Sequence, residues 1–572
     1  MKKYGKEFAL LVLCVMGTTF TTMFWPKLLG SLIDIAIPQK DTGMVLSVCG
    51  IMLLLVAVGV LCGIASSRFA ASISAGVGKE FRTRVFRKVS GFSMAQIDKF
   101  SPSSLITRTN NDIAQVQTFL NMCLDIALTA PIMCFIGIIL SVITSPSLSV
   151  VLVIAIPIMA LVMFLIGRRV LPLFSEIQEK TDLINLVIRE KLTGARVIRA
   201  FGTTKFEDEK FAKINDANRR LNKRAQRIVN MVMPLMIVTL ALTAAAVMWL
   251  AVHKHLNGTA SFTTGDVMAV VSYVVEIMAG VIMLTIVFVM LPRATASAKR
   301  VEEILVSENE INDPATPKGL SDLHGYLEFR DVSFAYKGSD TPALKHLTFK
   351  AGPGETTAII GGTGMGKTTI INLIPRLYDV TEGQVLVDGI DVRDYDLQVL
   401  RSKIGFVPQK AVLFSGTIDS NVGFGKHGAK EEEIEEAVTV AQSYDFVSAK
   451  EGGFSSHVAQ GGSNFSGGQK QRLAIARGIV SKPEIYVFDD SFSALDFKTD
   501  KALRTALKGQ TGNATVVIVA QRISTIMDAD RIIVIDAGDI VGIGTHSELL
   551  KSCDVYREIA VSQLGKEAAS NG

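Results

Sequence analysis

The sequence has little charge and few cysteines for its length. Only 20% of its 572 residues are charged, and 59 basic against 54 acidic side chains leave a formal net charge of +5. A chain that coats nucleic acid needs a concentrated basic excess, so this balance argues against a nucleic-acid partner. The six cysteines include no CxxC pair, which argues against both a zinc site and a disulfide framework.

Hydrophobic residues, in contrast, are abundant and unevenly distributed. They make up 49% of the chain, and the mean hydropathy of +0.36 is unusual for a soluble globular protein. A helix needs about 20 mostly apolar residues to cross a bilayer. Six segments in the first half of the chain meet this criterion, at 8–36, 44–74, 118–144, 148–172, 228–253 and 265–291.

Loop charges predict the orientation of these spans. The basic start MKKYGKEF and the apolar run after it could be a secretory signal, but the run is long, lacks an A-x-A-like cleavage site and is followed at once by a second span. Residues 79–117 carry an excess of lysine and arginine, whereas the turn 145–149 has no charge. Because basic loops stay in the cytoplasm, we expect loop 79–117 and both chain termini to be cytoplasmic.

Composition divides the chain into two domains. We expect a transmembrane domain over 1–305, a polar linker with two prolines and two glycines over 306–325, and a mixed, charged domain over 326–572. The connections 79–117 and 173–227 place apolar residues at three- and four-residue spacing among charges. This spacing predicts helices that continue the spans beyond the bilayer.

A phosphate-binding loop opens the second domain. GETTAIIGGTGMGKTTIINLI (354–374) runs from a β-rich stretch through glycines into a helix, and Gly361, Gly366, Lys367 and Thr368 fit G-x-x-x-x-G-K-[ST]. Backbone N–H groups would cradle the phosphates of ATP, Lys367 would reach the β and γ oxygens, and Thr368 would hold Mg²⁺. A glycine-rich turn without a nucleotide is the alternative. The remaining loop residues expected at the nucleotide are Gly362, Thr363, Gly364, Met365 and Thr369.

Two further segments support a nucleotide site. IYVFDD (485–490) is an apolar strand that ends in two carboxylates, from which Asp489 can reach Mg²⁺. NFSGGQ places Ser466, Gly467 and Gly468 at the expected start of a helix, which is a second anion-binding terminus. One nucleotide rarely needs two anion-binding helix N-termini from one domain. We therefore expect each of these sites to close on a nucleotide together with a second copy of the domain.

FSGGQ, GGTGMGKTT and IYVFDD behind six spans resemble the ABC transporter family, specifically an exporter-type half-transporter, over nearly the whole chain. A soluble chromosome-maintenance ATPase has similar signatures but no spans. The resemblance implies a transport ATPase built from a membrane α-helical domain of six transmembrane helices with long cytoplasmic extensions, fused to an α/β P-loop nucleotide-binding domain.

The same resemblance implies roles for single residues. Tyr336 stands where an aromatic ring stacks on adenine, and Gln409 stands where a glutamine contacts Mg²⁺ and the attacking water. The signature residues Ser466 to Gln469 would contact the γ-phosphate of the opposing nucleotide, and Asp496 would communicate across the dimer. The two cytoplasmic connections would dock on the nucleotide-binding domains.

Two positions depart from the family pattern. Asp490 replaces the glutamate that polarises the attacking water, and its carboxylate is one methylene shorter. Gln521, after what we take as the last strand VVIVA, replaces a histidine and cannot carry a proton's charge. The signature changes only at Phe465, where a leucine is usual. The pattern resembles the degenerate-site subunit of a bacterial heterodimeric multidrug exporter, which implies a different half-transporter as partner in the cell membrane.

The cargo is less well defined by the sequence. Asp125 and Glu276 lie inside predicted spans, where an acid is costly enough to be a candidate for cationic cargo or protons. A group near a span end or facing a wet cavity is the alternative. We expect export of lipophilic compounds first. Two alternatives remain open: an importer with the same fold, for instance for a siderophore, and a mainly regulatory ATP-binding subunit.

Overall fold

The computed structural model describes residues 2–259, 261–318 and 321–565, which form two compact units. Within these residues, the membrane unit comprises 2–88 and 103–306, and the nucleotide unit comprises 89–102 and 307–565. The nucleotide unit therefore includes a short piece of the first cytoplasmic connection. Gly319 and Leu320 of the predicted linker lie outside the described residues.

The described residues of the membrane unit form helices joined by short turns, and no β-strand. Six of its helical segments are long and apolar enough to cross a membrane, which confirms the predicted number of spans. Its helices are α1 (Gly5–Ser31), α2 (Thr42–Ser90), α4 (Pro102–Thr107), α5 (Ile113–Met122), α6 (Leu128–Thr144), α7 (Pro146–Thr193), α8 (Ala195–Ala200), α9 (Thr204–Asn230), α10 (Val232–Leu256) and α11 (Thr264–Val306). At 1.5 Å per residue, the 49 residues of α2 extend well beyond the hydrocarbon layer.

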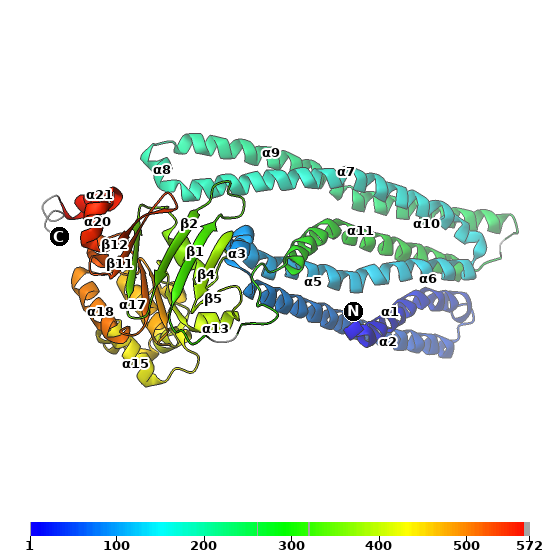
Figure 1. Ribbon diagram of the computed structural model, residues 1–572. Helices are drawn as coiled ribbons and strands as arrows, with labels where there is room; N and C mark the ends of the chain where they lie inside the picture. The colour runs from blue at the N-terminus through cyan, green and yellow to red at the C-terminus, as the bar shows by residue number, and fades with distance from the viewer. Residues whose placement is uncertain (1, 260, 319–320, 566–572) are drawn as a thin grey trace. The chain divides into compact units, whose positions relative to one another are not determined.

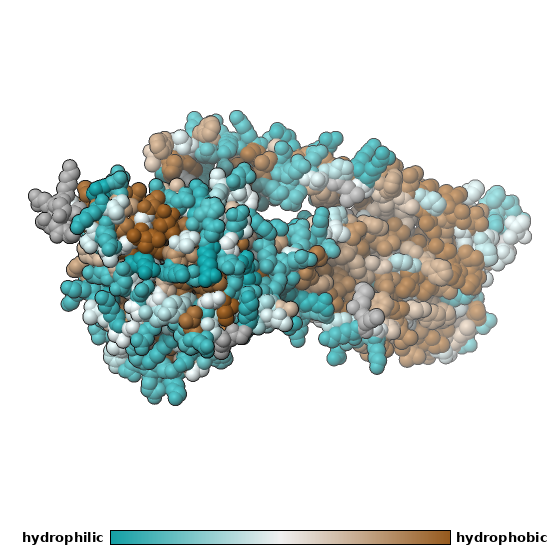
Figure 2. All heavy atoms as spheres, viewed as in Figure 1, coloured by the Kyte–Doolittle hydropathy of each residue, from teal (hydrophilic) through white to brown (hydrophobic). Residues whose placement is uncertain are grey.

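Apolar side chains cover the outside of these helices. Leu53, Leu61, Val153 and Trp249 are each at least 67% exposed. Figure 2 shows hydrophobic residues gathered over the helices of the membrane unit, whereas the surface of the nucleotide unit is mainly hydrophilic. Exposed apolar side chains on this scale mark a surface that lipid or another protein covers.

Polar contacts fix α11 against its neighbours in the membrane unit. At its start, Asp34 Oδ1 accepts a hydrogen bond of 2.8 Å from the N–H of Gly265, and Asp34 Oδ2 accepts one from the hydroxyl of Thr263. Near its end, Arg300 donates from Nε to Asp112 Oδ2 at 2.7 Å, and Ser297 donates to Asp112 Oδ1 at 2.9 Å. Both carboxylates belong to π-helical turns, Leu32–Ala36 and Arg108–Asp112.

The nucleotide unit is built on two main sheets (Figure 1). The six-stranded sheet has the order β12-β11-β3-β10-β9-β6, in which only β12 is antiparallel to its neighbour. The four-stranded sheet has the order β2-β1-β4-β5 and is antiparallel. A third, two-stranded sheet pairs β7 with β8.

The strands are β1 (Leu327–Phe334), β2 (Leu344–Ala351), β3 (Thr356–Gly361), β4 (Glu382–Val387), β5 (Ile390–Asp391), β6 (Ile404–Val407), β7 (Gly416–Thr417), β8 (His457–Val458), β9 (Ile485–Asp489), β10 (Thr515–Val519), β11 (Arg531–Asp536) and β12 (Asp539–Gly544). The helices are α3 (Met94–Phe100), α12 (Lys367–Leu373), α13 (Leu397–Ser402), α14 (Ile418–Val422), α15 (Glu431–Val440), α16 (Tyr444–Ser448), α17 (Gly467–Ile479), α18 (Phe497–Gln510), α19 (Ile523–Ile526), α20 (His546–Ser552) and α21 (Asp554–Leu564).

One observation differs from expectation. VVIVA begins within β10, and β11 and β12 follow it, so it is not the last strand. The segment after Val306, which we expected as a linker, packs on the nucleotide unit, since the N–H of Leu397 donates to Asp313 Oδ1 at 2.8 Å and Lys318 pairs with Asp394. A chain that reads as a linker by composition is held here by its polar side chains.

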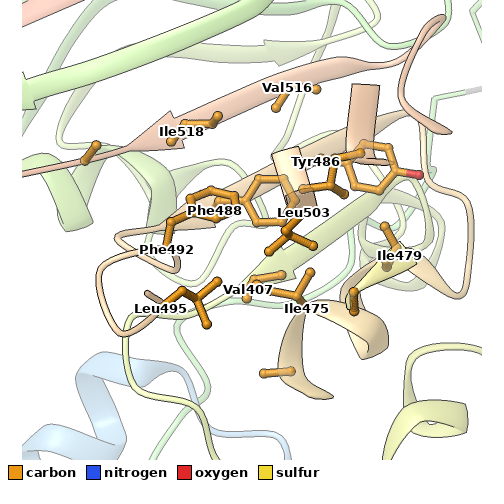
Figure 3. Close-up of a cluster of buried hydrophobic side chains, with 14 of the residues drawn as sticks. Val407, Ile475, Ile479, Tyr486, Phe488, Phe492, Leu495, Leu503, Val516 and Ile518 are labelled. Atoms are coloured by element: carbon orange, nitrogen blue, oxygen red, sulfur yellow. The ribbon is translucent and has the colours of Figure 1, made fainter. Parts of the chain in front are cut away.

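The central strands form the core of the nucleotide unit. Every residue of β9 and β10 is buried, as expected for parallel strands covered on both faces. Figure 3 shows Tyr486, Phe488 and Phe492 packed against Val407 and Leu503. This packing holds the ends of β6 and β9 in a fixed relation, and the site described next lies at these ends.

Candidate functional site

The predicted nucleotide residues lie at one edge of the six-stranded sheet. The phosphate loop follows β3, Gln521 follows β10, Asp489 ends β9, and Gln409 lies two residues beyond β6. These four strands are neighbours and parallel, so their carboxyl ends meet at one edge. Ligands of open parallel sheets bind at this edge.

Glycines give the phosphate loop its shape. Gly364 and Gly366 have φ of +82° and +91°, which L-residues with side chains rarely adopt. A Cβ at Gly366 would also lie 2.8 Å from the carbonyl oxygen of Ala343, so glycine is required there. The loop ends at the N-terminus of α12, whose free N–H groups favour an anion.

The side chain of Lys367 is held inside this loop by hydrogen bonds to backbone carbonyl groups. Its side chain is largely buried, and Nζ donates to the carbonyl oxygens of Gly361 at 2.9 Å and Gly362 at 2.6 Å. Burial lowers the pKa of the ammonium, while Asp490 and Asp489 act in the opposite direction. A buried cation satisfied only by carbonyl groups is well suited to exchange them for phosphate oxygens.

Thr368 and Asp489 meet where a metal ion would bind. The hydroxyl of Thr368 donates to Asp489 Oδ1 at 3.3 Å. Burial raises the pKa of the Asp489 carboxyl above its ordinary value, and Thr368 offsets this only in part. A hydroxyl and a carboxylate next to a phosphate loop are the oxygen donors that Mg²⁺ prefers, so these residues fit that ion.

Asp490 is held by two amides. Gln409 Nε2 lies 3.2 Å and Gln521 Nε2 lies 2.9 Å from the same oxygen, Oδ2 of Asp490. Asp490 is 8% exposed, its φ is +46°, and its N–H donates to the carbonyl oxygen of Val519 at 2.8 Å. The structure thus brings together the two unusual residues and directs the amide of one at the carboxylate of the other.

Gln563 supports this arrangement and was missed by sequence reasoning. From α21, its Nε2 donates to the carbonyl oxygen of Gln521 at 2.7 Å, and its Oε1 accepts from the N–H of Ile523 at 2.8 Å. No motif marks this glutamine, and only the packing of α21 beside α19 brings it to the loop.

Tyr336 lies beside the phosphate loop, where the resemblance places an adenine platform. Its ring is 39% exposed, and its hydroxyl lies 2.9 Å from that of Thr369 on α12. Phe334 packs edge-on against it, with ring centroids 4.9 Å apart. The ring therefore has an accessible surface on a fixed support, which is what stacking requires.

The signature segment presents its backbone to solvent within the nucleotide unit. Ser466 is the N-cap of α17, and it forms a capping box with Gln469. Ser466 and Gly467 are exposed, whereas Phe465 is buried, with Lys450 Nζ 4.4 Å from its ring centroid. Phe465 thus anchors the start of a helix whose own N–H groups remain accessible to an anion.

Asp496 has a local role in this chain. It is the N-cap of α18, and its Oδ2 accepts a hydrogen bond of 3.0 Å from the N–H of Thr499. Hydrogen bonding by the side chain of Thr499, and then by its backbone N–H, keeps the pKa of Asp496 below its ordinary value. The side chain is exposed, so its expected role across a dimer stays a prediction.

The two acids predicted as cargo candidates belong to the membrane unit. Asp125 is exposed in the π-helical turn Cys123–Ala127, between α5 and α6. Glu276 is half-buried in α11, next to the buried residues Ile277 and Met278. Their part in cargo binding stays a prediction.

Comparison with known proteins agrees with this geometry. The family described as the ABC transporter transmembrane region matches residues 8–282, and the family described as ABC transporter matches residues 344–493. An uncharacterised ABC transporter ATP-binding protein of Mycobacterium tuberculosis is 38% identical over 567 residues, which cover 98% of this chain and 97% of that protein.

Another relative and a solved structure also match over nearly their whole length. The ATP-dependent lipid A-core flippase of Salmonella typhimurium is 31% identical over 548 residues, with 95% of this chain and 93% of the flippase covered. A solved bacterial Atm1-family ABC exporter with ATP bound has the same fold, with a TM-score of 0.82, 24% identity and 99% of both chains covered. The chain belongs to the ABC transporter family, with a transmembrane region and an ATP-binding domain in one polypeptide that has an exporter-type fold.

Proposed function

We propose that this chain is one half of a heterodimeric, ATP-driven exporter of a bacterial cell membrane. Its own ATP site hydrolyses slowly, and its signature segment completes the faster site of a different half-transporter. The observation that carries this proposal is the environment of Asp490, whose Oδ2 accepts hydrogen bonds from both Gln409 and Gln521.

Slow hydrolysis follows from the reach and the hydrogen bonding of Asp490. A general base must lie within hydrogen-bond distance of the water that it activates. Aspartate is one methylene shorter than glutamate, and a retreat of about 1 Å can reduce the rate about a hundredfold. The two amides also occupy one carboxylate oxygen, so this oxygen must release a hydrogen bond before it can accept one from the attacking water.

The residues proposed to bind ATP remain suited to it. The ammonium of Lys367 takes the β and γ oxygens, the N–H groups of the loop surround the phosphates, and Tyr336 stacks on adenine. Thr368 and Asp489 would hold Mg²⁺, with Gln409 near the same ion, and the ion would neutralise charge on the phosphates. The site therefore binds ATP and holds it for long periods.

Transport follows from closure of two nucleotide domains on ATP. This chain's Ser466 and Gly467 would approach the γ-phosphate bound by the partner, and the partner's signature would approach the ATP bound here. Closure moves the membrane helices only if contacts differ between the open and closed states. The extensions of the membrane helices into the cytoplasm would transmit the movement of the nucleotide domains to the membrane.

The proposed cargo is a lipophilic or amphiphilic compound. The apolar surface of the membrane unit and the relationship to a protein named as a lipid A-core flippase favour molecules that partition into the bilayer. Asp125 and Glu276 are the candidates for recognising a positive charge on such a molecule.

ATPase activity of the purified chain tests the slow site. Alone in lipid nanodiscs, the chain should bind ATP but turn it over slowly, and Asp490→Asn should change this low rate little, whereas Lys367→Ala should abolish binding. Rapid turnover by the chain alone that Asp490→Asn abolishes would refute the proposal.

Inside-out vesicles test the direction of transport. With the partner present, an exporter accumulates a lipophilic cationic dye in these vesicles when ATP is added outside, and Lys367→Ala reduces the uptake. Loss of preloaded compound from the same vesicles would instead identify an importer.

A further inference from the structure

Three aromatic rings form a cluster beside the phosphate loop. Tyr378 follows α12, and its ring centroid lies 5.5 Å from that of Tyr336, with an interplanar angle of 87°. Phe334 contacts both, at 4.9 Å from Tyr336 and 5.6 Å from Tyr378. Rings packed edge-to-face limit each other's motion, so a planar base stacked on Tyr336 also limits the motion of the Tyr378 ring.

The hydroxyl of Tyr378 reaches a helix from a distant part of the sequence. It donates a hydrogen bond of 3.0 Å to Oδ2 of Asp98, on α3. Burial, together with the hydrogen bond to Asp98, raises the pKa of Tyr378 well above its ordinary value. The phenol is therefore neutral and able to donate at any physiological pH.

α3 belongs to the nucleotide unit although the chain enters it from a membrane helix. It lies between α2 and α4, and residues 89–102 form one compact unit with the nucleotide-binding fold. A capping box of Ser93 and Gln96 defines its start, and Gln96 Nε2 donates to the carbonyl oxygen of Glu308 at 2.6 Å. The hydrogen bond from Tyr378 to Asp98 holds the C-terminal part of α3.

We propose that Tyr378 is a positioning residue that links base binding at Tyr336 to the position of α3 through Asp98. The inference rests on the proposed ATP site at Tyr336. A planar base stacked on Tyr336 limits the motion of the Tyr336 ring. Because the two rings are in contact, the ring of Tyr378 is restricted as well, and its hydroxyl keeps its hydrogen bond to Asp98. The ligand class that acts through this link is a nucleoside triphosphate, because a triphosphate without a base occupies only the phosphate loop. Linkage requires the reverse effect as well, so fixing α3 strengthens binding of the base.

Hydrogen exchange of the full chain in nanodiscs tests the link, with MgATP and magnesium tripolyphosphate as probes. In the wild type, ATP should slow exchange in residues 92–102 about tenfold and tripolyphosphate should have little effect. Tyr378→Phe keeps the ring and removes the donor, so it should lose the ATP-dependent slowing. Asp98→Ala should lose it too, whereas Asp98→Asn keeps an acceptor and should retain most of it.

Controls separate this link from general stability and from the ATP site itself. Tyr444→Phe, in α16 and outside the cluster, should behave as the wild type, and adding Asp98→Ala to Tyr378→Phe should cause no further loss. Full slowing in Tyr378→Phe, or equal slowing by tripolyphosphate, would overturn the link while leaving the ATP site intact. Failure of the wild type to bind ATP in calorimetry would overturn the proposed ATP site and the link with it.

Discussion

At the scale of single residues, the proposed nucleotide site keeps the residue types that the family resemblance implies for binding but has an aspartate, Asp490, at the position of the proposed base. Lys367, Thr368 and Asp489 form contacts that phosphate and Mg²⁺ can take over, whereas Asp490 shares one oxygen between Gln409 and Gln521. Asp490 and Gln521 are thus neighbours in space as well as joint departures from the family pattern. A change at one of them alters the surroundings of the other, and their effects should not be additive.

Restoring both residues should therefore restore hydrolysis better than restoring either. In the chain alone, Asp490→Glu with Gln521→His should raise steady-state ATPase activity about a hundredfold, and each single substitution should give less than about a tenth of that gain. Lys367→Ala in the double variant should remove the gained activity. An equal gain from Asp490→Glu alone would show that the amide of Gln521 does not restrain the base.

The raised pKa of Asp489 predicts how Mg²⁺ binding depends on pH. A carboxyl with a raised pKa keeps its proton to a higher pH, and Mg²⁺ needs the ionised form. The affinity for Mg²⁺ in the presence of ATP should therefore rise as pH increases through the raised pKa and become constant above it. Mg²⁺ titrations over a pH series measure this effect. Asp489→Asn should bind more weakly and show only the pH dependence of ATP itself.

At the scale of helices and strands, the order of strands decides what the site contains. Periodicity and motifs predicted the six spans, the phosphate loop and the helix that begins after Ser466, because each of these depends on a local run of residues. They could not predict that Gln409 and Gln521 converge on Asp490. That convergence depends on β6, β9 and β10 being adjacent, and strand order is set by long-range packing.

The same limit explains the other features that sequence reading missed. Residues 79–117 looked helical throughout, but the chain turns at 91–93 and forms the separate helix α3. Tyr378 and Gln563 carry no motif, and their roles follow only from what folds beside them. Asp125 and Glu276 were recognisable as unusual, but nothing local indicates what they bind.

One tertiary contact in the membrane unit lends itself to a stability test. The carboxylate of Asp112 is 4% exposed and accepts hydrogen bonds from Arg300 and Ser297 on α11. Asp112→Ala removes these hydrogen bonds and should cost about 2 kcal/mol, because the Arg300 side chain is 44% exposed and water can partly replace the carboxylate. The loss should appear as a lower midpoint of thermal unfolding in detergent. The carboxylate of Glu303, which pairs with Arg108, is 47% exposed, so Glu303→Gln should change stability by less than about 1 kcal/mol. Equal shifts for the two variants would contradict this reading.

At the scale of the whole molecule, one polypeptide contains one membrane domain, one phosphate loop and one signature. The phosphate loop lies at the carboxyl edge of the six-stranded sheet, while the signature leaves Ser466 and Gly467 exposed at the start of α17. In the proposed heterodimer these two surfaces act in different sites. The slow site uses the phosphate loop of this chain, and the fast site uses its signature.

Steady-state ATPase activity of the co-expressed pair tests this division most directly. Ser466→Arg in this chain should abolish most of the activity, because it blocks the site that the partner's phosphate loop forms with this signature. Asp490→Asn in this chain should leave at least about half of the activity. If Asp490→Asn abolishes hydrolysis while Ser466→Arg leaves it intact, the fast site is on this chain and the account is wrong.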